Sequence, residues 1–244
     1  MRNLIVIPAY NEQEALPKTL ESLQALGDEF ELLIINDGST DATLNVARQA
    51  AAASRLKAYL VNMPSNCGIG ATVQTGYLFA EKCGGYDYVI QFDADGQHDA
   101  ASLARLVAEC RAKELDLCVG SRFLSDENCG FRSTFARRMG SRFFAGLISL
   151  LSGVKVTDPT SGLRCAGARA ARSFARFYPD DYPEPESLFW CARNKLRIGE
   201  IPVRMHERQG GASSIRYLNN IYYMLKVSLA ILVDSLRIRE FHDQ

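Results

Sequence analysis

Short apolar runs alternate with longer amphipathic stretches through the first half of the chain. The runs at 4–7, 30–35, 56–61, 86–92 and 115–119 predict strands, and the stretches at 12–26, 41–53, 70–82 and 99–113 predict helices. Apolar residues follow one another within the runs, which is typical of strands buried on both faces. The pattern therefore predicts an α/β fold with a mostly parallel sheet flanked by helices. In such folds, ligands bind beyond the carboxyl ends of the strands.

The second half of the chain has a less regular pattern. It predicts a helix at 131–151, a loop at 155–167, a short helix at 186–194, a strand at 198–205 and an amphipathic helix from 214 to 239. The sequence contains no internal repeat and no flexible linker. We expect one domain over residues 1–214 and a C-terminal amphipathic helical tail over residues 215–244.

Composition narrows the class of protein only slightly. The 244 residues are 47% hydrophobic and carry 28 basic and 28 acidic side chains, so the overall charge gives no indication of nucleic-acid binding. The seven cysteines are scattered, without a Cys-x-x-Cys pair, which argues against a zinc site or disulfide framework and favours a reducing cytoplasm. We expect no signal peptide, because a strand begins almost at once. No apolar run reaches the roughly 20 residues that span a bilayer.

Two carboxylates and an amide follow the strand predicted at 86–92. Asp93, Asp95 and Gln97 are alternate residues, so on an extended backbone their side chains point the same way. Oxygen ligands of this kind suit a Mg²⁺ or Mn²⁺ ion that bridges a substrate diphosphate. The same residues also fit a polar turn that leads into a helix capped by Asp99. This segment alone leaves both interpretations open.

Polar motifs also follow the first three predicted strands. They are Pro8-Ala9-Tyr10-Asn11-Glu12, Asn36-Asp37-Gly38-Ser39-Thr40-Asp41 and Asn66-Cys67-Gly68-Ile69-Gly70-Ala71. Each motif alone could be a turn or a helix cap, but in a parallel sheet all of them would face one cleft. The turn after the first strand contains no glycine and the chain has no P-loop, which argues against NAD and ATP binding.

Together with the Asp93–His98 segment, these motifs resemble family 2 glycosyltransferases of the GT-A fold. The resemblance is strongest to the dolichol-phosphate (polyprenyl-phosphate) mannosyltransferase-like subgroup and covers nearly all of residues 1–216. Three downstream motifs extend it: Gly120-Ser121-Arg122, Thr157-Asp158-Pro159-Thr160-Ser161-Gly162-Leu163-Arg164 and Arg208-Gln209-Gly210-Gly211-Ala212-Ser213-Ser214. The resemblance implies a Rossmann-like GT-A domain. It also implies metal-dependent, inverting transfer of a sugar from a GDP- or UDP-linked donor to a polyprenyl phosphate.

The resemblance also implies roles for individual residues. The donor-binding set is Pro8, Tyr10, Asn11, Glu12, Asp37, Gly70, Asp93, Ala94 and Arg208, and the ligands of Mg²⁺ or Mn²⁺ are Asp93, Asp95 and Gln97. The acceptor-phosphate set is Arg122, Arg137 and Ser141.

Two positions depart from the family pattern. Ser214 stands where the family often has lysine, and the segment 182–186 differs, with Glu186 as the closest match to a family acid. The prolines that flank Glu184 predict a rigid, extended loop.

Two alternative functions remain open at this stage. A hydroxyl acceptor in polysaccharide or glycolipid synthesis would need a general base, and Asp158 or Glu186 could supply it. A non-catalytic nucleotide-sugar-binding assembly protein is the alternative of another class, and the intact Asp93, Asp95 and Gln97 set argues against it.

Basic and aromatic residues on the helices predicted at 131–151 and 214–239 are compatible with lipid headgroups. They are equally compatible with packing on the sheet or with a dimer interface. We expect a cytoplasmic protein that is peripheral at the inner face of the membrane. A small membrane protein partner and a homo-oligomer are both compatible with this expectation.

Overall fold

The computed structural model describes the backbone of residues 1–124, 135–206 and 217–236. It describes the side chains of residues 1–124, 138–206 and 222–236. The strands are β1 Asn3–Ala9, β2 Phe30–Asn36, β3 Ala58–Asn62, β4 Tyr88–Gln91, β5 Leu117–Ser121, β6 Arg164–Gly167 and β7 Ile198–Pro202. The helices are α1 Leu16–Leu23, α2 Thr43–Ala53, α3 Gly68–Cys83, α4 Ala101–Ala112, α5 Phe135–Ser152, α6 Ala168–Arg176, α7 Pro183–Arg193 and α8 Tyr217–Leu236.

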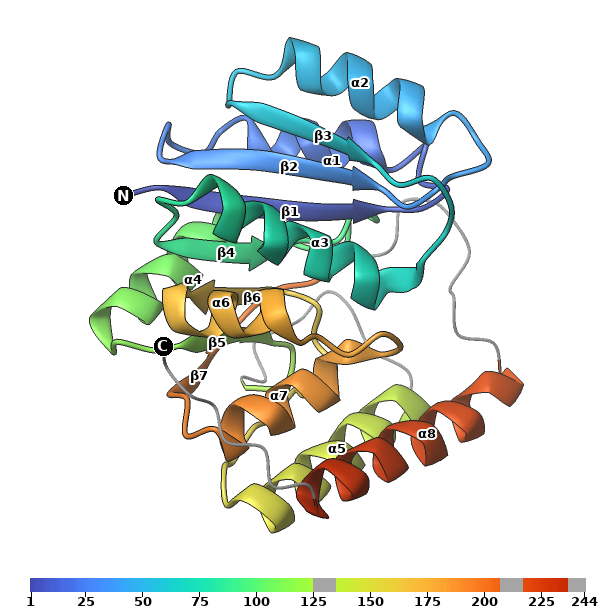
Figure 1. Ribbon diagram of the computed structural model, residues 1–244, viewed down its shortest axis with the longest axis vertical. Helices are drawn as coiled ribbons and strands as arrows, with labels where there is room; N and C mark the ends of the chain where they lie inside the picture. Colours follow the sequence, from blue (N-terminus) through green and yellow to red (C-terminus); the bar gives the residue numbers. More distant parts are fainter. Residues whose placement is uncertain (125–134, 207–216, 237–244) are drawn as a thin grey trace.

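The seven strands form one sheet in the order β3-β2-β1-β4-β6-β5-β7 (Figure 1). The pairs β1–β2, β2–β3, β1–β4 and β5–β7 are parallel, whereas β6 is antiparallel to both β4 and β5. The predicted α/β fold with a mostly parallel sheet is confirmed. The prediction of a loop throughout 155–167 is wrong for the four residues of β6, and helix α6 directly after them was not predicted.

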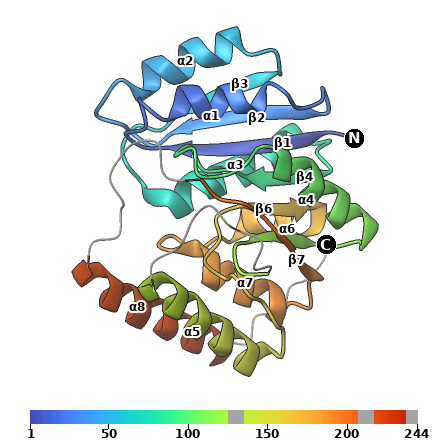
Figure 2. The same cartoon turned by 180° about the vertical axis from the view of Figure 1, so that it is seen from behind.

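Two apolar cores cover the two faces of the sheet, and alternate residues of each strand enter opposite cores. From β1, Leu4 and Val6 join the core beneath α3 and α6, while Ile5 and Ile7 join the core beneath α1 and α4. Figures 1 and 2 show these helices on opposite sides of the sheet. Burial on both faces explains the continuous apolar runs in the sequence.

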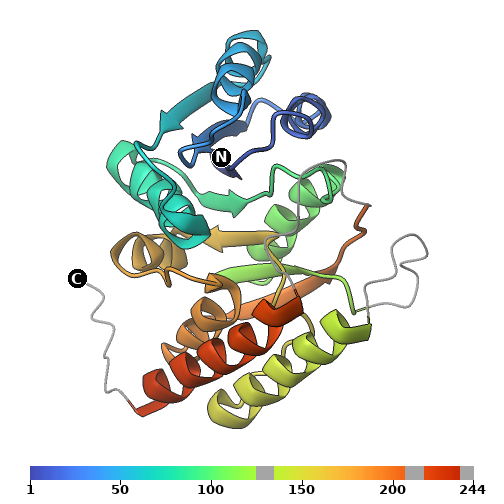
Figure 3. The ribbon, with the colours of Figure 1, turned by 90° about the vertical axis from the view of Figure 1, so that its right-hand side faces the viewer.

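Helices α5, α7 and α8 form a further layer beside the β5–β7 end of the sheet. Figure 3 shows α5 and α8 side by side as the outermost helices, and α7 contacts both. Tyr223 of α8 packs against Phe144 of α5 and Tyr182, with ring centroids 5.3 and 4.5 Å apart. The described part of the predicted tail is therefore packed against the rest of the protein.

Helix α7 corrects the prediction of an extended loop around Glu184. Pro183 lies in the first turn, where its fixed φ suits a helix start and its missing N–H costs no hydrogen bond. Tyr182 precedes the helix in the left-handed conformation, with φ of 53°. The two prolines therefore begin a helix and do not hold an extended chain.

Candidate active site

The motifs after β1 and β2 are joined by hydrogen bonds between backbone and side chains. The Asn11 side-chain oxygen accepts a hydrogen bond from the Thr40 N–H at 2.9 Å, and the Asn11 N–H donates to the Ser39 hydroxyl at 3.0 Å. The Glu12 N–H donates to the Thr43 hydroxyl at 2.8 Å. Two loops that are distant in sequence thus form one wall at the carboxyl edge of the sheet.

Asp37 joins this wall to the beginning of α3. Its two carboxylate oxygens accept hydrogen bonds from the N–H groups of Cys67 and Gly68, at 2.8 and 3.1 Å. The side chain thereby satisfies two of the N–H groups left without a helical partner at the start of α3. Along the same edge, Pro8 is buried, whereas Tyr10 is 44% exposed and presents its ring to solvent.

Gly70 and Ala94 take part through the backbone. The Gly70 N–H donates to the Asp180 carbonyl at 3.0 Å, and a Cβ at Gly70 would lie 2.1 Å from the Asp180 and Pro179 carbonyl oxygens. The structure therefore requires glycine here for close packing against the segment before α7. The Ala94 carbonyl accepts a hydrogen bond from the Thr19 hydroxyl at 2.9 Å, which ties the turn after β4 to α1.

The turn after β4 carries the predicted metal ligands. The Gln97 N–H donates to the Asp95 carboxylate at 3.0 Å, and Gly96 has a φ of 74°, so these residues form a tight turn. The Asp93 carboxylate lies 3.1 Å from Nε2 of the buried His98. The Gln97 carbonyl accepts a hydrogen bond from the His206 N–H at 2.8 Å, so this turn is also joined to the segment that follows β7.

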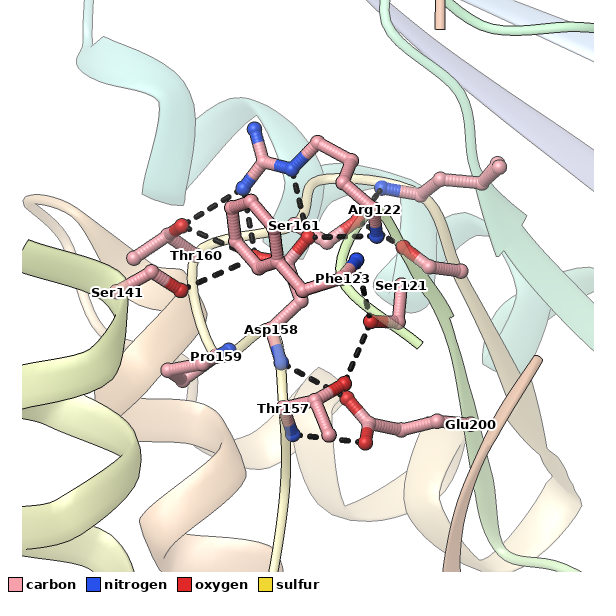
Figure 4. A network of polar contacts seen from close by, with 12 residues as sticks. Ser121, Arg122, Phe123, Ser141, Thr157, Asp158, Pro159, Thr160, Ser161 and Glu200 are labelled. Atoms are coloured by element: carbon pink, nitrogen blue, oxygen red, sulfur yellow. Dashed lines mark hydrogen bonds and ion pairs between the residues drawn. The ribbon is translucent and has the colours of Figure 1, made fainter. Parts of the chain in front are cut away.

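A buried ion pair joins Arg122, which directly follows β5, to Asp158 in the loop between α5 and β6 (Figure 4). The Arg122 guanidinium donates to both carboxylate oxygens of Asp158, at 2.6 and 2.7 Å, and to the Thr160 hydroxyl at 2.7 Å. The Ser141 hydroxyl lies 3.4 Å from the same carboxylate. From the other side, Glu200 of β7 accepts hydrogen bonds from the N–H groups of Thr157 and Asp158 at 2.8 and 3.0 Å.

These contacts bear on the expected roles of Asp158 and Arg122. Burial would raise the pKa of Asp158, but the hydrogen bonds and charge of Arg122 outweigh it and the pKa is lowered. Asp158 is also wholly inaccessible to solvent, and both of its carboxylate oxygens accept hydrogen bonds from Arg122. Its expected role as a general base stays a prediction. The charge of Arg122 is largely neutralised by Asp158 and is only in part available to an acceptor phosphate.

Two acidic residues of α7 lie in different surroundings. Glu184 interacts electrostatically with Asp93 and with Arg164, whereas the charges that act on Glu186 are those of Asp234, Lys226 and neighbouring acids. Glu184 therefore lies within electrostatic reach of Asp93, and Glu186, the residue expected from the sequence, lies within reach of charges on α8. Burial raises the pKa of Glu184, and it raises the pKa of Glu186 to about 7.

Two further basic residues were expected at the site. Arg208 lies outside the described residues, and so does the side chain of Arg137, whose backbone belongs to α5.

Comparison with known families identifies the fold and the class of enzyme. The model for glycosyl transferase family 2 matches residues 4–171, more than half of the chain. The chain belongs to this family. It is a glycosyltransferase of the GT-A fold, and the motifs that follow β1, β2 and β4 lie at the carboxyl edge of its sheet.

Curated relatives match along nearly the whole chain. The polyprenol monophosphomannose synthase of Mycolicibacterium smegmatis is 28% identical over 233 residues, which cover 93% of this chain and 86% of the relative. The undecaprenyl-phosphate mannosyltransferase of Micrococcus luteus is 31% identical over 220 residues, 88% of each chain. Among solved structures, glucosyl-3-phosphoglycerate synthase from Mycobacterium tuberculosis with Mn²⁺ and UDP superposes with a TM-score of 0.67 at 20% identity, covering 98% of this chain and 81% of that one.

The expected metal ligands of this glycosyltransferase suit a hard divalent cation. Asp93 and Asp95 supply carboxylates and Gln97 supplies an amide oxygen from a single turn. Over residues 1–124, 138–206 and 222–236, no three His, Cys, Asp or Glu side chains gather into a metal cluster. A Mg²⁺ or Mn²⁺ ion held by the two carboxylates and the amide would keep positions for diphosphate oxygens or water, which such ions prefer.

Proposed function

We propose that this glycosyltransferase moves a hexose from a GDP- or UDP-linked sugar to a polyprenyl phosphate, with inversion at the anomeric carbon and with Mg²⁺ or Mn²⁺. The observation that carries the proposal is the match, over 93% and 88% of this chain, to relatives named polyprenol monophosphomannose synthase and undecaprenyl-phosphate mannosyltransferase. The arrangement of the carboxyl edge supports it. The Asp37 wall, the Asp93–Gln97 turn and the Arg122–Asp158 pair all lie there, so donor and acceptor could be held side by side.

The acceptor determines which protein groups the reaction needs. A phosphate monoester is already an oxyanion at pH 7, so it attacks without a protein base and needs groups that bind and orient it. Arg122, Arg137 and Ser141 are the groups we propose for this task. A bound divalent ion would neutralise charge on the leaving nucleoside diphosphate. In this scheme, Asp158 fixes the direction of the Arg122 guanidinium and takes no proton.

A second function is favoured by one specific observation. Glu184 lies at the site, within electrostatic reach of Asp93, and burial raises its pKa. A carboxylate with a raised pKa is a stronger base than an ordinary one. If the acceptor is a hydroxyl of a growing glycan or glycolipid, Glu184 is the side chain that we would assign as its base, in place of Asp158 or Glu186.

We also propose that the protein docks peripherally on the inner face of a membrane through α5 and α8. The outward faces of the two helices carry Met139, Phe143, Leu150, Tyr222, Leu225, Leu229, Leu232, Val233 and Leu236, all exposed. Arg138 and Arg142 are exposed on the same part of α5 and would meet anionic headgroups. Within the described residues, no helix has the length and apolar character needed to cross a bilayer.

The position of α5 connects this outer face to the site. Ser141 points inward to Asp158, whereas Phe143, two residues later, is 49% exposed. A lipid phosphate held near Ser141 would therefore have its chain close to the membrane surface. A small membrane protein or a second copy of the chain are alternative occupants of the same face.

An acceptor comparison tests the proposed reaction. Purified protein, Mn²⁺ and a panel of GDP- and UDP-sugars are incubated with undecaprenyl phosphate or with undecaprenol, and release of nucleoside diphosphate is measured. We expect release only with the phosphate, and nearly unchanged turnover in Glu184→Gln. Release with undecaprenol or a saccharide, lost in Glu184→Gln, would establish the second function instead. Donor binding with no release under any condition would contradict both.

A further inference from the structure

Arg164, at the start of β6, is the largest side chain in the core that is almost fully buried. It is 1% exposed, and among the described residues it forms no ion pair. Its guanidinium instead donates three hydrogen bonds to neutral oxygens. They go from Nε to the Ser161 carbonyl at 2.8 Å, from Nη2 to the Pro159 carbonyl at 2.9 Å and from Nη1 to the Ser187 hydroxyl at 2.8 Å. A buried cation is costly unless such partners are fixed in place.

The three acceptors come from two elements that flank the site. Pro159 and Ser161 belong to the loop that carries Asp158, and Ser187 belongs to the first turns of α7, where its hydroxyl donates on to the Pro183 carbonyl at 2.6 Å. Arg164 therefore fastens the loop at 157–163 to the beginning of α7. The charge of Arg164 also acts on Glu184, in the first turn of α7, and offsets part of the effect of burial on its pKa.

The loop that Arg164 holds lies directly against the proposed metal turn. A Cβ at Gly162 would come within 2.6 Å of the Asp93 carboxylate, so loop and carboxylate are in close contact. The loop is also held near its start by the Arg122–Asp158 pair, and next to Gly162 by the Ser161 hydroxyl, which donates to the Gly120 carbonyl at 2.7 Å. A displacement of residues 159–162 would thus change where the acceptor side of the site lies relative to Asp93.

We propose that Arg164 is a positioning residue that holds the acceptor loop 157–163 against α7 and Asp93 in the geometry required for transfer. The proposal rests on the proposed glycosyl transfer, because the loop is assigned there to the acceptor side. Arg164 touches no substrate. A small displacement of reacting groups is enough to lower turnover about 100-fold. The affinity for the nucleotide, which we assign to Asp37 and the wall formed by the loops after β1 and β2, should stay unchanged.

The test compares Arg164→Gln and Arg164→Lys with Arg197→Gln, a control at an exposed arginine directly before β7. Three quantities are measured: kcat with the acceptor, the Kd of the nucleoside diphosphate with Mn²⁺, and hydrogen exchange over residues 157–163. We expect kcat to fall about 100-fold in Arg164→Gln, with Kd unchanged within about twofold and faster exchange in the loop. Arg164→Lys keeps the charge but not the forked donors, so its loss should be intermediate.

The outcomes separate this proposal from the proposed function. Wild-type kcat or unchanged loop exchange in Arg164→Gln would overturn the positioning role. Equal loss of kcat and donor binding would also overturn it, since that indicates a general structural effect. If the wild type transfers to no acceptor, the proposed function fails. Hydrogen exchange over residues 157–163 and the Kd of the nucleoside diphosphate then still decide whether Arg164 holds the loop. If Arg164→Gln does not fold, Arg164→Lys is judged by the same three measurements.

Discussion

Asp158 and Arg122 are the most tightly paired charges of the site, with Asp158 fully buried and Arg122 nearly so. Asp158→Asn would keep the shape but leave the guanidinium without its counter-charge. We expect the free energy of unfolding to fall by about 3–5 kcal/mol, the usual cost of breaking one side of a buried pair. Urea unfolding measures it. In the double variant Arg122→Gln/Asp158→Asn no charge is left unpaired, so its loss should be smaller than the sum of the two single losses. Strict additivity would show that the two side chains are not coupled.

Glu186 gives a stability effect that depends on pH. Its pKa rises from 4.5 to about 7 in the folded protein, chiefly through burial and then through the charge of Asp234. The folded state therefore holds the proton more tightly than the unfolded state, so stability falls as pH rises from 4.5 to about 7 and is level above that. Glu186→Gln should leave stability unchanged near pH 4 and raise it by roughly 1–3 kcal/mol at pH 8. Urea unfolding at both pH values checks this, with the exposed Glu81→Gln as control. An equal effect at both pH values would contradict the pKa shift.

At the scale of elements, the first half was predictable because β1, β2 and β5 are continuous buried apolar runs and the helices between the strands are amphipathic. The edge where Asp37, Asp93 and Asp95 gather follows from the parallel sheet alone. Strand β6 was not predictable from its pattern, since it has four residues and begins with a charged side chain, Arg164. It is a strand because β4 and β5 supply hydrogen-bonding partners on both sides.

The acids of α7 show why the rest of the site could not be predicted. On an extended chain, Glu184 and Glu186 would share a face, whereas on a helix residues two apart point in nearly opposite directions. Once the segment is helical, only one of the two can face Asp93, and the packing of α7 decides that it is Glu184. The Asp158–Arg122 pair joins residues 36 positions apart, and no local pattern indicates it.

Membrane docking through the outward face of α5 and α8 can be tested separately from folding, because the leucines on this face are exposed and do not belong to the core. Leu225, Leu229 and Leu232 are 68, 63 and 44% exposed on one side of α8. Replacing all three by Gln should lower binding to vesicles that contain anionic lipid roughly 100-fold, from the lost burial of apolar area. The melting temperature should not change. Leu78→Gln, an exposed leucine on α3, is the control and should bind like the wild type. If the wild type binds no vesicles but is a dimer that the triple variant dissociates, the face is an interface between copies of the chain.

At the scale of the whole molecule, ligand binding should stabilise the fold, because the donor wall and the metal turn follow different strands at the same sheet edge. Asp37 follows β2, Asp95 follows β4, and the Gln97 carbonyl is bonded to His206 beyond β7. A ligand that needs both sides holds these elements together. Binding at about 100 times Kd adds roughly 2.7 kcal/mol to the free energy of unfolding, which for a chain of this size is a rise in melting temperature of about 5–10 °C.

We therefore expect GDP or UDP to raise the melting temperature only when Mn²⁺ or Mg²⁺ is present, and EDTA to remove the rise. Asp95→Asn should lose this metal-dependent part and the turnover while keeping the melting temperature of the free protein. Asp99→Asn is the matched control: its side chain accepts a hydrogen bond from the Ala101 N–H at 3.0 Å, and asparagine serves equally well at a helix start. It should behave like the wild type. A ligand stabilises the protein only through contacts made in the folded state. A full thermal shift in Asp95→Asn would therefore mean that the cation binds elsewhere. A shift that persists in EDTA would mean that donor binding needs no cation.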